Sequence, residues 1–234
     1  MTVKLAQLKV SPNISLNVEK IKKILTTAKS GEWILFPEGM ISGYYPEDDD
    51  FLKKLDNTEI EKAIGEIEDL VFTKKANCLI GTALKIKDQW FNTTIILSNG
   101  QRKIYRKNNL SILDRQHFSA GSEIKVMSDD SFLFGVAMCR ELIFPEQWRL
   151  LKKKKAQVIF HINNAIRPID KLRENVLITR ALENQYWVCS VNNATAPQTM
   201  KSMVINPQGE IVWASTPQKE ELGEVNIDLK LRGE

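Results

Sequence analysis

The fold class that the sequence predicts is α/β, with helices layered around mixed sheets and not around a simple parallel wound sheet. Apolar, strand-like runs alternate with amphipathic helical segments along the whole chain. Hairpins interrupt this alternation, and the strongest hairpin signal is Asn99-Gly100, because both residues tolerate positive φ. The length of 234 residues and the hydrophobic content of 43% suit one domain, residues 1–234, with a sizeable core.

The elements expected in the first half follow from periodicity and from chain breakers. Residues 3–10 alternate weakly, as a strand does, and residues 11–13 (SPN) end the alternation. Apolar side chains then recur at helical spacing as far as Ala28, with lysines largely on the opposite face. Residues 33–36 (WILF) predict a short buried strand that Pro37 stops. After a loop over 43–50, the expected elements are an amphipathic helix over 60–71, strands over 79–84 and 90–98, and a return strand ending at Tyr105.

The second half repeats the pattern of strands and helices. Residues 111–123 have the composition of a loop, and two short strands follow, the second of which ends at Cys139. Pro145 and Glu146 suit the first turn of a helix that reaches about Lys155. Asp170 suits the cap of a helix with apolar residues between 172 and 182. The other expected elements are strands over 157–162 and 187–191, a hairpin of 202–206 and 210–214, and a last strand over 222–228.

Composition excludes several classes of function. The net charge of +4 is too small to predict a nucleic-acid partner, and no apolar run is long enough to span a bilayer. Three cysteines do not form a disulfide framework, and without a signal-peptide pattern they predict a cytoplasmic protein. The two histidines lack metal-ligand spacing, so we expect no metal. Neither GxGxxG nor GxxxxGK[ST] occurs, so no phosphate-binding loop is expected.

Cys139 lies at the most informative corner of the chain. An apolar strand ends there, and the start of a helix follows within a few residues. A thiol at such a corner would lie near free backbone N–H groups, which favour the thiolate. A lone cysteine is more often a small buried hydrophobe, and the corner alone does not decide between these two interpretations.

Glu38, Lys107 and Cys139 each follow the end of an apolar strand. Ligand sites in layered α/β folds gather beyond the carboxyl ends of strands, so the three side chains could converge. The thiol would be the nucleophile, the carboxylate would move its proton, and the ammonium would stabilise negative charge on the attacked atom. Taken singly, Glu38 and Lys107 are more often surface residues, and physics alone does not select them from 29 acidic and 33 basic side chains.

His161 gives a rival catalytic pair with Cys139, because it also ends a strand. Its commoner role at such a position is that of a hydrogen-bonded structural histidine. A non-enzymatic binding protein with the same fold is the second rival.

Five segments, in order, resemble the nitrilase (carbon–nitrogen hydrolase) superfamily over almost the whole chain. Residues 36–44 (FPEGMISGY) look like the segment of its catalytic glutamate. Residues 90–110, from WFNT to YRKNNL, are similar to the hairpin that leads into its catalytic lysine. The others are the cysteine elbow, 136–139 (VAMC) with 144–146 (FPE), then 180–184 (RALEN) with 191–192, and finally Ser202 with 207–209 (PQG).

The resemblance implies a four-layer αββα sandwich and no cofactor. It also implies that Glu38 is the general base and acid, that Lys107 stabilises the oxyanion with the backbone N–H of Arg140, and that Cys139 forms a thioester. Asp114 occupies the place of a second glutamate found in many members. Such enzymes commonly pair through helices near the cysteine, so a homodimer is expected.

The expected substrate is a small amide. Amidase-type members are the larger part of the family, and the alternatives are an N-carbamoyl compound or a nitrile at the same site. Tyr44, Arg140 and Asn163 are the candidates to line the substrate pocket. Arg140, which replaces the usual aromatic residue after the cysteine, suggests an acidic group on the substrate, because guanidinium binds carboxylates well.

Overall fold

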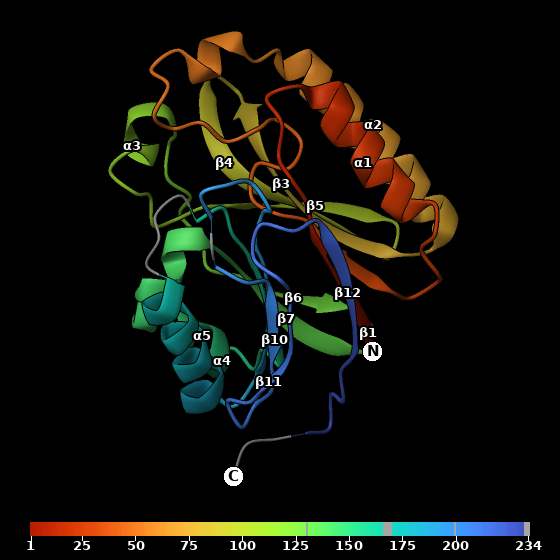
Figure 1. Ribbon diagram of the computed structural model, residues 1–234, viewed down its shortest axis with the longest axis vertical. Helices are drawn as coiled ribbons and strands as arrows, with labels where there is room; N and C mark the ends of the chain where they lie inside the picture. The colour runs from red at the N-terminus through yellow and green to blue at the C-terminus, as the bar shows by residue number, and fades with distance from the viewer. Residues whose placement is uncertain (130, 166–169, 199, 232–234) are drawn as a thin grey trace.

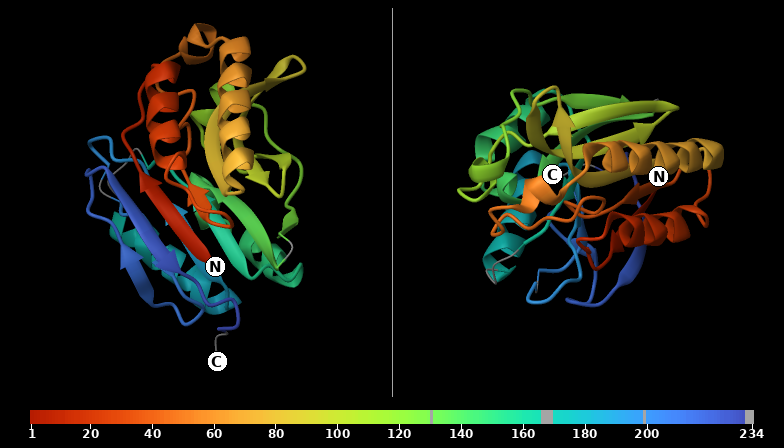
Figure 2. Two further views of the ribbon diagram at one scale, coloured as in Figure 1. Left: turned by 90° about the vertical axis from the view of Figure 1, so that its right-hand side faces the viewer. Right: turned by 90° about the horizontal axis from the view of Figure 1, so that it is seen from above.

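Two mixed β-sheets lie face to face at the centre of the protein, and helices cover their outer faces (Figures 1 and 2). The computed structural model describes residues 1–129, 131–165, 170–198 and 200–231. Within these residues each sheet has six strands. The two-sheet arrangement confirms the expected α/β fold with hairpins among its parallel strands.

The first sheet has the order β12-β1-β2-β3-β4-β5. Its three central strands, β1 to β3, are parallel, whereas β12, β4 and β5 pair antiparallel at the two sides. The strand bounds are β1 Thr2–Gln7, β2 Trp33–Leu35, β3 Asn77–Ile86, β4 Gln89–Ser98, β5 Gln101–Arg106 and β12 Glu221–Asn226.

The second sheet repeats this pattern with the order β11-β10-β9-β8-β7-β6. Strands β7 to β9 are parallel at its centre, and the flanking pairs are antiparallel. The bounds are β6 Val126–Asp129, β7 Phe132–Met138, β8 Val158–Ile162, β9 Trp187–Val191, β10 Met203–Ile205 and β11 Ile211–Ala214. Because the central strands are parallel in each sheet, their carboxyl ends lie at one edge of that sheet.

Three apolar clusters define four layers. Helices α1 (Ile14–Leu25) and α2 (Asn57–Lys74) bury their apolar faces against one side of the first sheet. Helices α4 (Pro145–Lys153) and α5 (Asp170–Asn184) do the same on the second sheet. A third cluster fills the space between the sheets, where the ring centroids of Trp33 and Phe160 stack at 4.9 Å. The layers are therefore helices, sheet, sheet, helices (Figure 1).

Three short helical turns were not expected from the sequence: η1 (Phe51–Lys54), α3 (Asp114–His117) and η2 (Cys139–Ile143). Turns this short have too few residues to show a helical period, so local capping and tertiary contacts decide them. In α3, Asp114 N–H donates to Ser111 Oγ and Ser111 N–H donates to Asp114 Oδ2, at 2.9 and 3.0 Å. This reciprocal pair is a capping box, whose S-x-x-D pattern is visible in the sequence.

Gly81 allows the chain after β2 to lie directly against β3. A Cβ atom on Gly81 would lie 2.4 Å from Glu38 Cα and 2.6 Å from Pro37 O, both of them backbone atoms. The Gly81 N–H instead donates to Pro37 O at 3.2 Å, and Ile41 N–H donates to Gly81 O at 3.2 Å. Glycine at this position therefore fixes where the residue after the strand, Glu38, is held.

Candidate active site

Glu38 is fully buried where the chain leaves β2. Its Oε1 accepts hydrogen bonds from Asn92 Nδ2 at 2.8 Å and from Lys107 Nζ at 2.9 Å. Its Oε2 has no hydrogen-bond partner among the residues that the structure describes. Burial raises the pKa of Glu38 despite the opposing charge of Lys107, and the nearby Asp114 carboxylate adds to the rise. The side chain is therefore poised to gain a proton.

Lys107 follows β5 and lies between two carboxylates. Its Nζ is 2.9 Å from Glu38 Oε1 and 2.8 Å from Asp114 Oδ2, and it lies 5.9 Å from the centre of the Tyr44 ring. Burial alone would lower the pKa of Lys107, but the charge of Glu38 and the other nearby acidic groups raise it well above its ordinary value. The ammonium group consequently keeps its positive charge in a site with almost no exposure to water.

Asp114 opens the short helix α3 and reaches Lys107 although aspartate is one methylene shorter than glutamate. Tyr44 OH donates to its Oδ1 at 2.7 Å, while Lys107 and the Ser111 N–H donate to its Oδ2. Burial raises the pKa of Asp114, but Lys107 and the other donors outweigh burial and lower it. Asp114 is therefore an ionised partner that holds Lys107 in place.

Cys139 begins the turn η2 at the end of β7 and has φ of 40°, in the left-handed region. A non-glycine residue in this conformation is strained by about 1–3 kcal/mol, and such strain is typical of active sites. Its Sγ lies 3.8 Å from the carbonyl oxygen of Asn164. Burial raises the pKa of the thiol to about 12, and Glu38 adds to the rise, whereas Lys107 opposes it. The expectation that the corner favours the thiolate was wrong, because η2 separates Cys139 from α4 and the sulfur is desolvated.

His161 does not contact the sulfur of Cys139. Its Nε2 lies 3.1 Å from the backbone carbonyl oxygen of Cys139, and its Nδ1 lies 2.8 Å from Ser190 Oγ. A carbonyl oxygen only accepts, so Nε2 carries the proton, and Nδ1 accepts from the serine hydroxyl. Burial lowers the pKa of His161 to about 4, which keeps the ring neutral. Both nitrogens are thus engaged in the scaffold, as expected for a structural histidine.

Glu141 ties the lysine loop to the cysteine turn, and sequence reasoning had given it no role. Its carboxylate accepts from the backbone N–H of Met138 and Asn108 at 2.8 Å, from that of Asn109 at 3.1 Å, and from Tyr105 OH. Burial raises the pKa of Glu141, although these donors oppose the rise. One buried side chain therefore connects the segments that carry Lys107 and Cys139.

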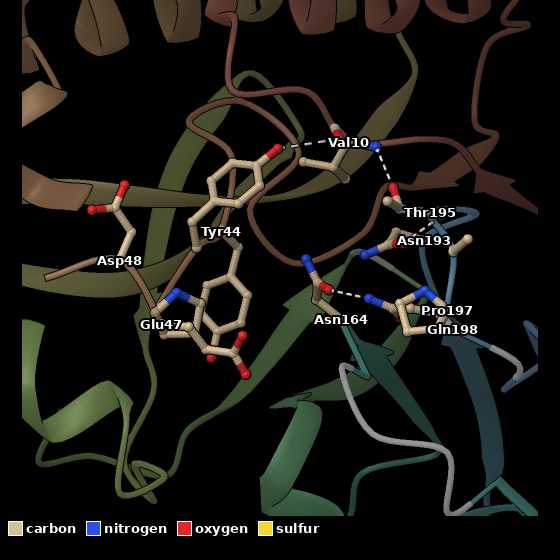
Figure 3. A pocket seen from close by; sticks show the side chains of 12 residues that line it. Val10, Tyr44, Glu47, Asp48, Asn164, Asn193, Thr195, Pro197 and Gln198 are labelled. Atoms are coloured by element: carbon tan, nitrogen blue, oxygen red, sulfur yellow. Dashed lines mark hydrogen bonds between the residues drawn. The ribbon is translucent and has the colours of Figure 1, made fainter. Parts of the chain in front are cut away.

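A cavity of about 220 Å³ is lined by both Lys107 and Cys139. Its other lining residues are Tyr44, Pro46, Ser111, Ile112, Leu113, Arg140, Asn164 and Arg173. A second cavity of about 350 Å³ shares Tyr44, Pro46 and Asn164 with it and extends to Glu47 and Asp48 (Figure 3). In Figure 3, Asn164 lies between the tyrosine side of this second cavity and Gln198, to which its Oδ1 is hydrogen-bonded.

The three residues expected to line the pocket have different outcomes. Tyr44 lies in the wall of both cavities, and the exposed Arg140 lies at the first cavity. Asn163 lines neither of these cavities, because it is fully buried and its Nδ2 donates to Met200 Sδ at 3.0 Å. Its neighbour Asn164 lines both instead. Consecutive side chains of the extended chain after β8 point to opposite sides, so of two neighbouring residues only one faces the cavities. That residue is Asn164 and not the predicted Asn163.

The described residues contain neither a cluster of metal ligands nor a membrane-spanning helix. No three His, Cys, Asp or Glu side chains within them are grouped so as to hold a metal ion. No helix in the same part of the chain is long and apolar enough to cross a membrane.

Comparison with known proteins identifies the same family as the sequence motifs do. The sequence model of the carbon–nitrogen hydrolase family matches residues 2–234. A nitrilase of Pyrococcus abyssi is 27% identical, with 98% of this chain and 91% of that protein aligned. A 2-oxoglutaramate amidase of Bacillus subtilis is also 27% identical, over 91% of this chain and 85% of that protein.

A solved structure shares the fold. An amidase of Nesterenkonia, whose structure shows acrylamide added to its active-site cysteine, superposes with a TM-score of 0.87 at 17% identity, covering 98% of this chain and 95% of that one. Its two-sheet α/β architecture is the one seen here. The family match over the whole chain, together with this fold, shows that the protein belongs to the carbon–nitrogen hydrolase family of the nitrilase superfamily.

Proposed function

We propose that this carbon–nitrogen hydrolase cleaves a small amide through a thioester on Cys139, with Glu38 as general base and acid and Lys107 as the stabiliser of the oxyanion. One observation carries the proposal. The ammonium of Lys107 lies between two buried carboxylates, 2.9 Å from Glu38 and 2.8 Å from Asp114, and borders the same cavity as the Cys139 thiol.

The first half of the reaction begins with a neutral thiol, because the pKa of Cys139 is about 12. The free Oε2 of Glu38 accepts the Sγ proton as sulfur attacks the amide carbon. Negative charge then develops on the amide oxygen, where the Lys107 ammonium and the backbone N–H of Arg140 stabilise it. Glu38 returns the proton to the departing nitrogen, the carbon–nitrogen bond breaks, and ammonia or an amine leaves a thioester behind.

The second half of the reaction uses the same groups. Glu38, again ionised, takes a proton from water as the water oxygen attacks the thioester carbon. The new oxyanion occupies the same position near Lys107. Its collapse breaks the carbon–sulfur bond, Glu38 returns the proton to sulfur, and the carboxylic acid product leaves. In both halves Asp114 keeps Lys107 charged and fixed, which a buried ammonium requires.

The preference for an amide over a nitrile or an N-carbamoyl compound is supported by amidases among the similar proteins, one of which carries an adduct on its active-site cysteine. A nitrilase is also among them, so the nitrile is the second candidate. The decisive experiment measures ammonia release from a panel of short amides, carbamoyl compounds and nitriles, with Cys139→Ser as the blank. The proposal is supported if the wild type releases ammonia from amides and Cys139→Ser does not. If no compound of the panel gives either ammonia or an adduct on Cys139, the enzyme interpretation is wrong and the protein is a binding protein with the same fold.

We also propose that the protein acts as a homodimer in a reducing, cytoplasmic environment. Apolar side chains of η2, α4 and α5 are exposed outside the second sheet, namely Ile143, Leu150, Leu172 and Leu182. Light scattering coupled to gel filtration should give twice the mass of the chain, 26.8 kDa, and a monomer at all concentrations would contradict the dimer. The three cysteines are free thiols, which suits a reducing compartment.

A further inference from the structure

The cavity at Cys139 is lined by positive charge. Lys107, Arg140 and Arg173 all border it, and the described part of the chain contributes no Asp or Glu to its lining. The charge of Lys107 is balanced by its contacts with Glu38 and Asp114. The two arginines therefore leave the cavity with positive charge that the catalytic groups do not neutralise.

Arg173 is the less satisfied of the two arginines. It lies in the first turn of α5, and its buried Nη1 has no hydrogen-bond partner among the described residues. Its side chain makes no ion pair with any residue that the structure describes. A buried N–H group that makes no hydrogen bond is costly, and a cation in the first turn also opposes the helix dipole. Local violations of this kind are expected where a ligand completes the site.

The position of Arg173 relative to the thiol is a separate observation. Arg173 borders the same cavity as Cys139, and its charge is close enough to lower the pKa of that thiol against the effects of burial and Glu38. Arg140, directly after Cys139, is exposed and has its guanidinium carbon 5.9 Å from the Phe144 ring centre. Of the two arginines that line the cavity, Arg173 therefore has a buried guanidinium nitrogen and Arg140 is exposed.

We propose that the acyl part of the substrate carries a carboxylate, which pairs with Arg173 inside the cavity and is assisted by Arg140, so that the substrate is a monoamide of a short dicarboxylic acid. This inference rests on the proposed amide hydrolysis. Guanidinium presents two parallel N–H donors that match a carboxylate, and such charge-assisted pairs are the strong ones.

The adjoining cavity fixes the direction of the substrate. Glu47 and Asp48 line it, and the residues that the structure describes place no arginine or lysine in its wall. An anionic group is disfavoured there, whereas ammonia or a protonated amine is not. The carboxylate therefore belongs to the acyl part, and the departing nitrogen belongs on the side of Glu47 and Asp48, which Figure 3 labels in the second cavity.

The test compares three substrates: the monoamide of glutaric acid, the uncharged pentanamide with the same number of carbons, and N-butanoylglycine, which carries its carboxylate on the nitrogen side. We expect wild-type kcat/KM to be highest for the glutaric monoamide. In Arg173→Gln the ratio of kcat/KM for this substrate to that for pentanamide should fall by about 10- to 150-fold, the range of a lost charge-assisted hydrogen bond. Arg173→Lys, which keeps the charge but not the fork, should give an intermediate ratio.

Arg149→Gln is the matched control, because Arg149 is an exposed arginine of α4 outside both cavities. It should keep the wild-type ratio. A wild-type ratio near one, a ratio unaffected by Arg173→Gln, or a preference for N-butanoylglycine would overturn the carboxylate proposal and leave amide hydrolysis standing.

A binding measurement separates the two proposals. Glutarate, which resembles the product, is titrated by calorimetry into Cys139→Ser and into Cys139→Ser combined with Arg173→Gln. We expect binding that weakens at least tenfold in the double variant. Arg173-dependent binding of glutarate without hydrolysis of any amide would support the carboxylate site and overturn the proposed reaction. Equal affinity of both proteins for glutarate would contradict the proposed pairing of Arg173 with the carboxylate.

Discussion

Gly81→Ala tests whether the contact between β3 and the loop after β2 positions Glu38. The added Cβ would lie 2.4 Å from Glu38 Cα, whereas ordinary contact begins at 3.4 Å, so the loop has to move by about 1 Å. The nearest atoms all belong to backbone, so no side-chain rotation can relieve the clash. Overpacking of this kind costs about 1–3 kcal/mol of folding free energy. A 1 Å displacement of a catalytic group reduces kcat/KM about 100-fold.

Gly65→Ala is the matched control for this change. Gly65 lies within α2, has no atom within 4 Å of an added Cβ, and has no positive φ. Alanine there should stabilise the protein by about 0.5–1 kcal/mol and leave the kinetics unchanged. The assay combines urea unfolding with kcat/KM for the best amide of the panel, measured where circular dichroism shows each variant folded. A folded Gly81→Ala protein with wild-type kcat/KM would refute the positioning role of this contact.

The remaining predictions concern buried ionisable groups. Glu141→Gln replaces one acceptor oxygen by an NH₂ group that faces other N–H donors, and should lower the urea-derived free energy of unfolding by about 2–3 kcal/mol. An unchanged free energy would show that the four groups that donate to Glu141 find other acceptors. Because the thiol pKa is about 12, the rate of Cys139 labelling by iodoacetamide should rise tenfold per pH unit from pH 7 to 10 without a plateau. Glu38→Gln removes a charge that raises this pKa, so this variant should be labelled faster than the wild type although it no longer releases ammonia. A plateau near neutral pH would indicate a stable thiolate. The pKa of His161 falls on folding from 6.5 to about 4, so the unfolded chain binds more protons than the folded chain between these pH values. As the pH drops from 6.5 to 4, the free energy of unfolding of the wild type should therefore decrease by up to about 3 kcal/mol more than that of His161→Gln. Parallel curves of this free energy against pH would contradict the buried neutral ring.

Strands with continuous apolar runs could be predicted from the sequence, because burial on both faces leaves a compositional signal. The run at 33–36 and the run at 187–191 correspond to β2 and β9 within one residue at each end. The loop predicted over 111–123 contains α3, because a single helical turn has no period to detect. Its capping pair, Ser111 with Asp114, was nevertheless a usable signal.

The convergence of Glu38, Lys107 and Cys139 could be expected from strand ends and family resemblance, but the groups that hold them in place could not. Asn92 lies inside β4, and nothing in its sequence neighbourhood indicates that its amide reaches Glu38. The pKa of Cys139 was misjudged because burial, which dominates it, depends on the whole fold. Arg173 reads as an ordinary charge on an amphipathic helix until the cavity beside it is known.

The covalent intermediate is the most direct test of the proposed chemistry. The wild-type protein is mixed with a hydrolysed amide, quenched in acid within a single turnover, and analysed by intact mass and peptide mapping. We predict that the mass of the acyl group appears on the peptide containing Cys139, at the same time as the first equivalent of ammonia, and that Cys139→Ser gives neither. Ammonia release without acylation of that peptide, or release that persists in Cys139→Ser, would contradict the account.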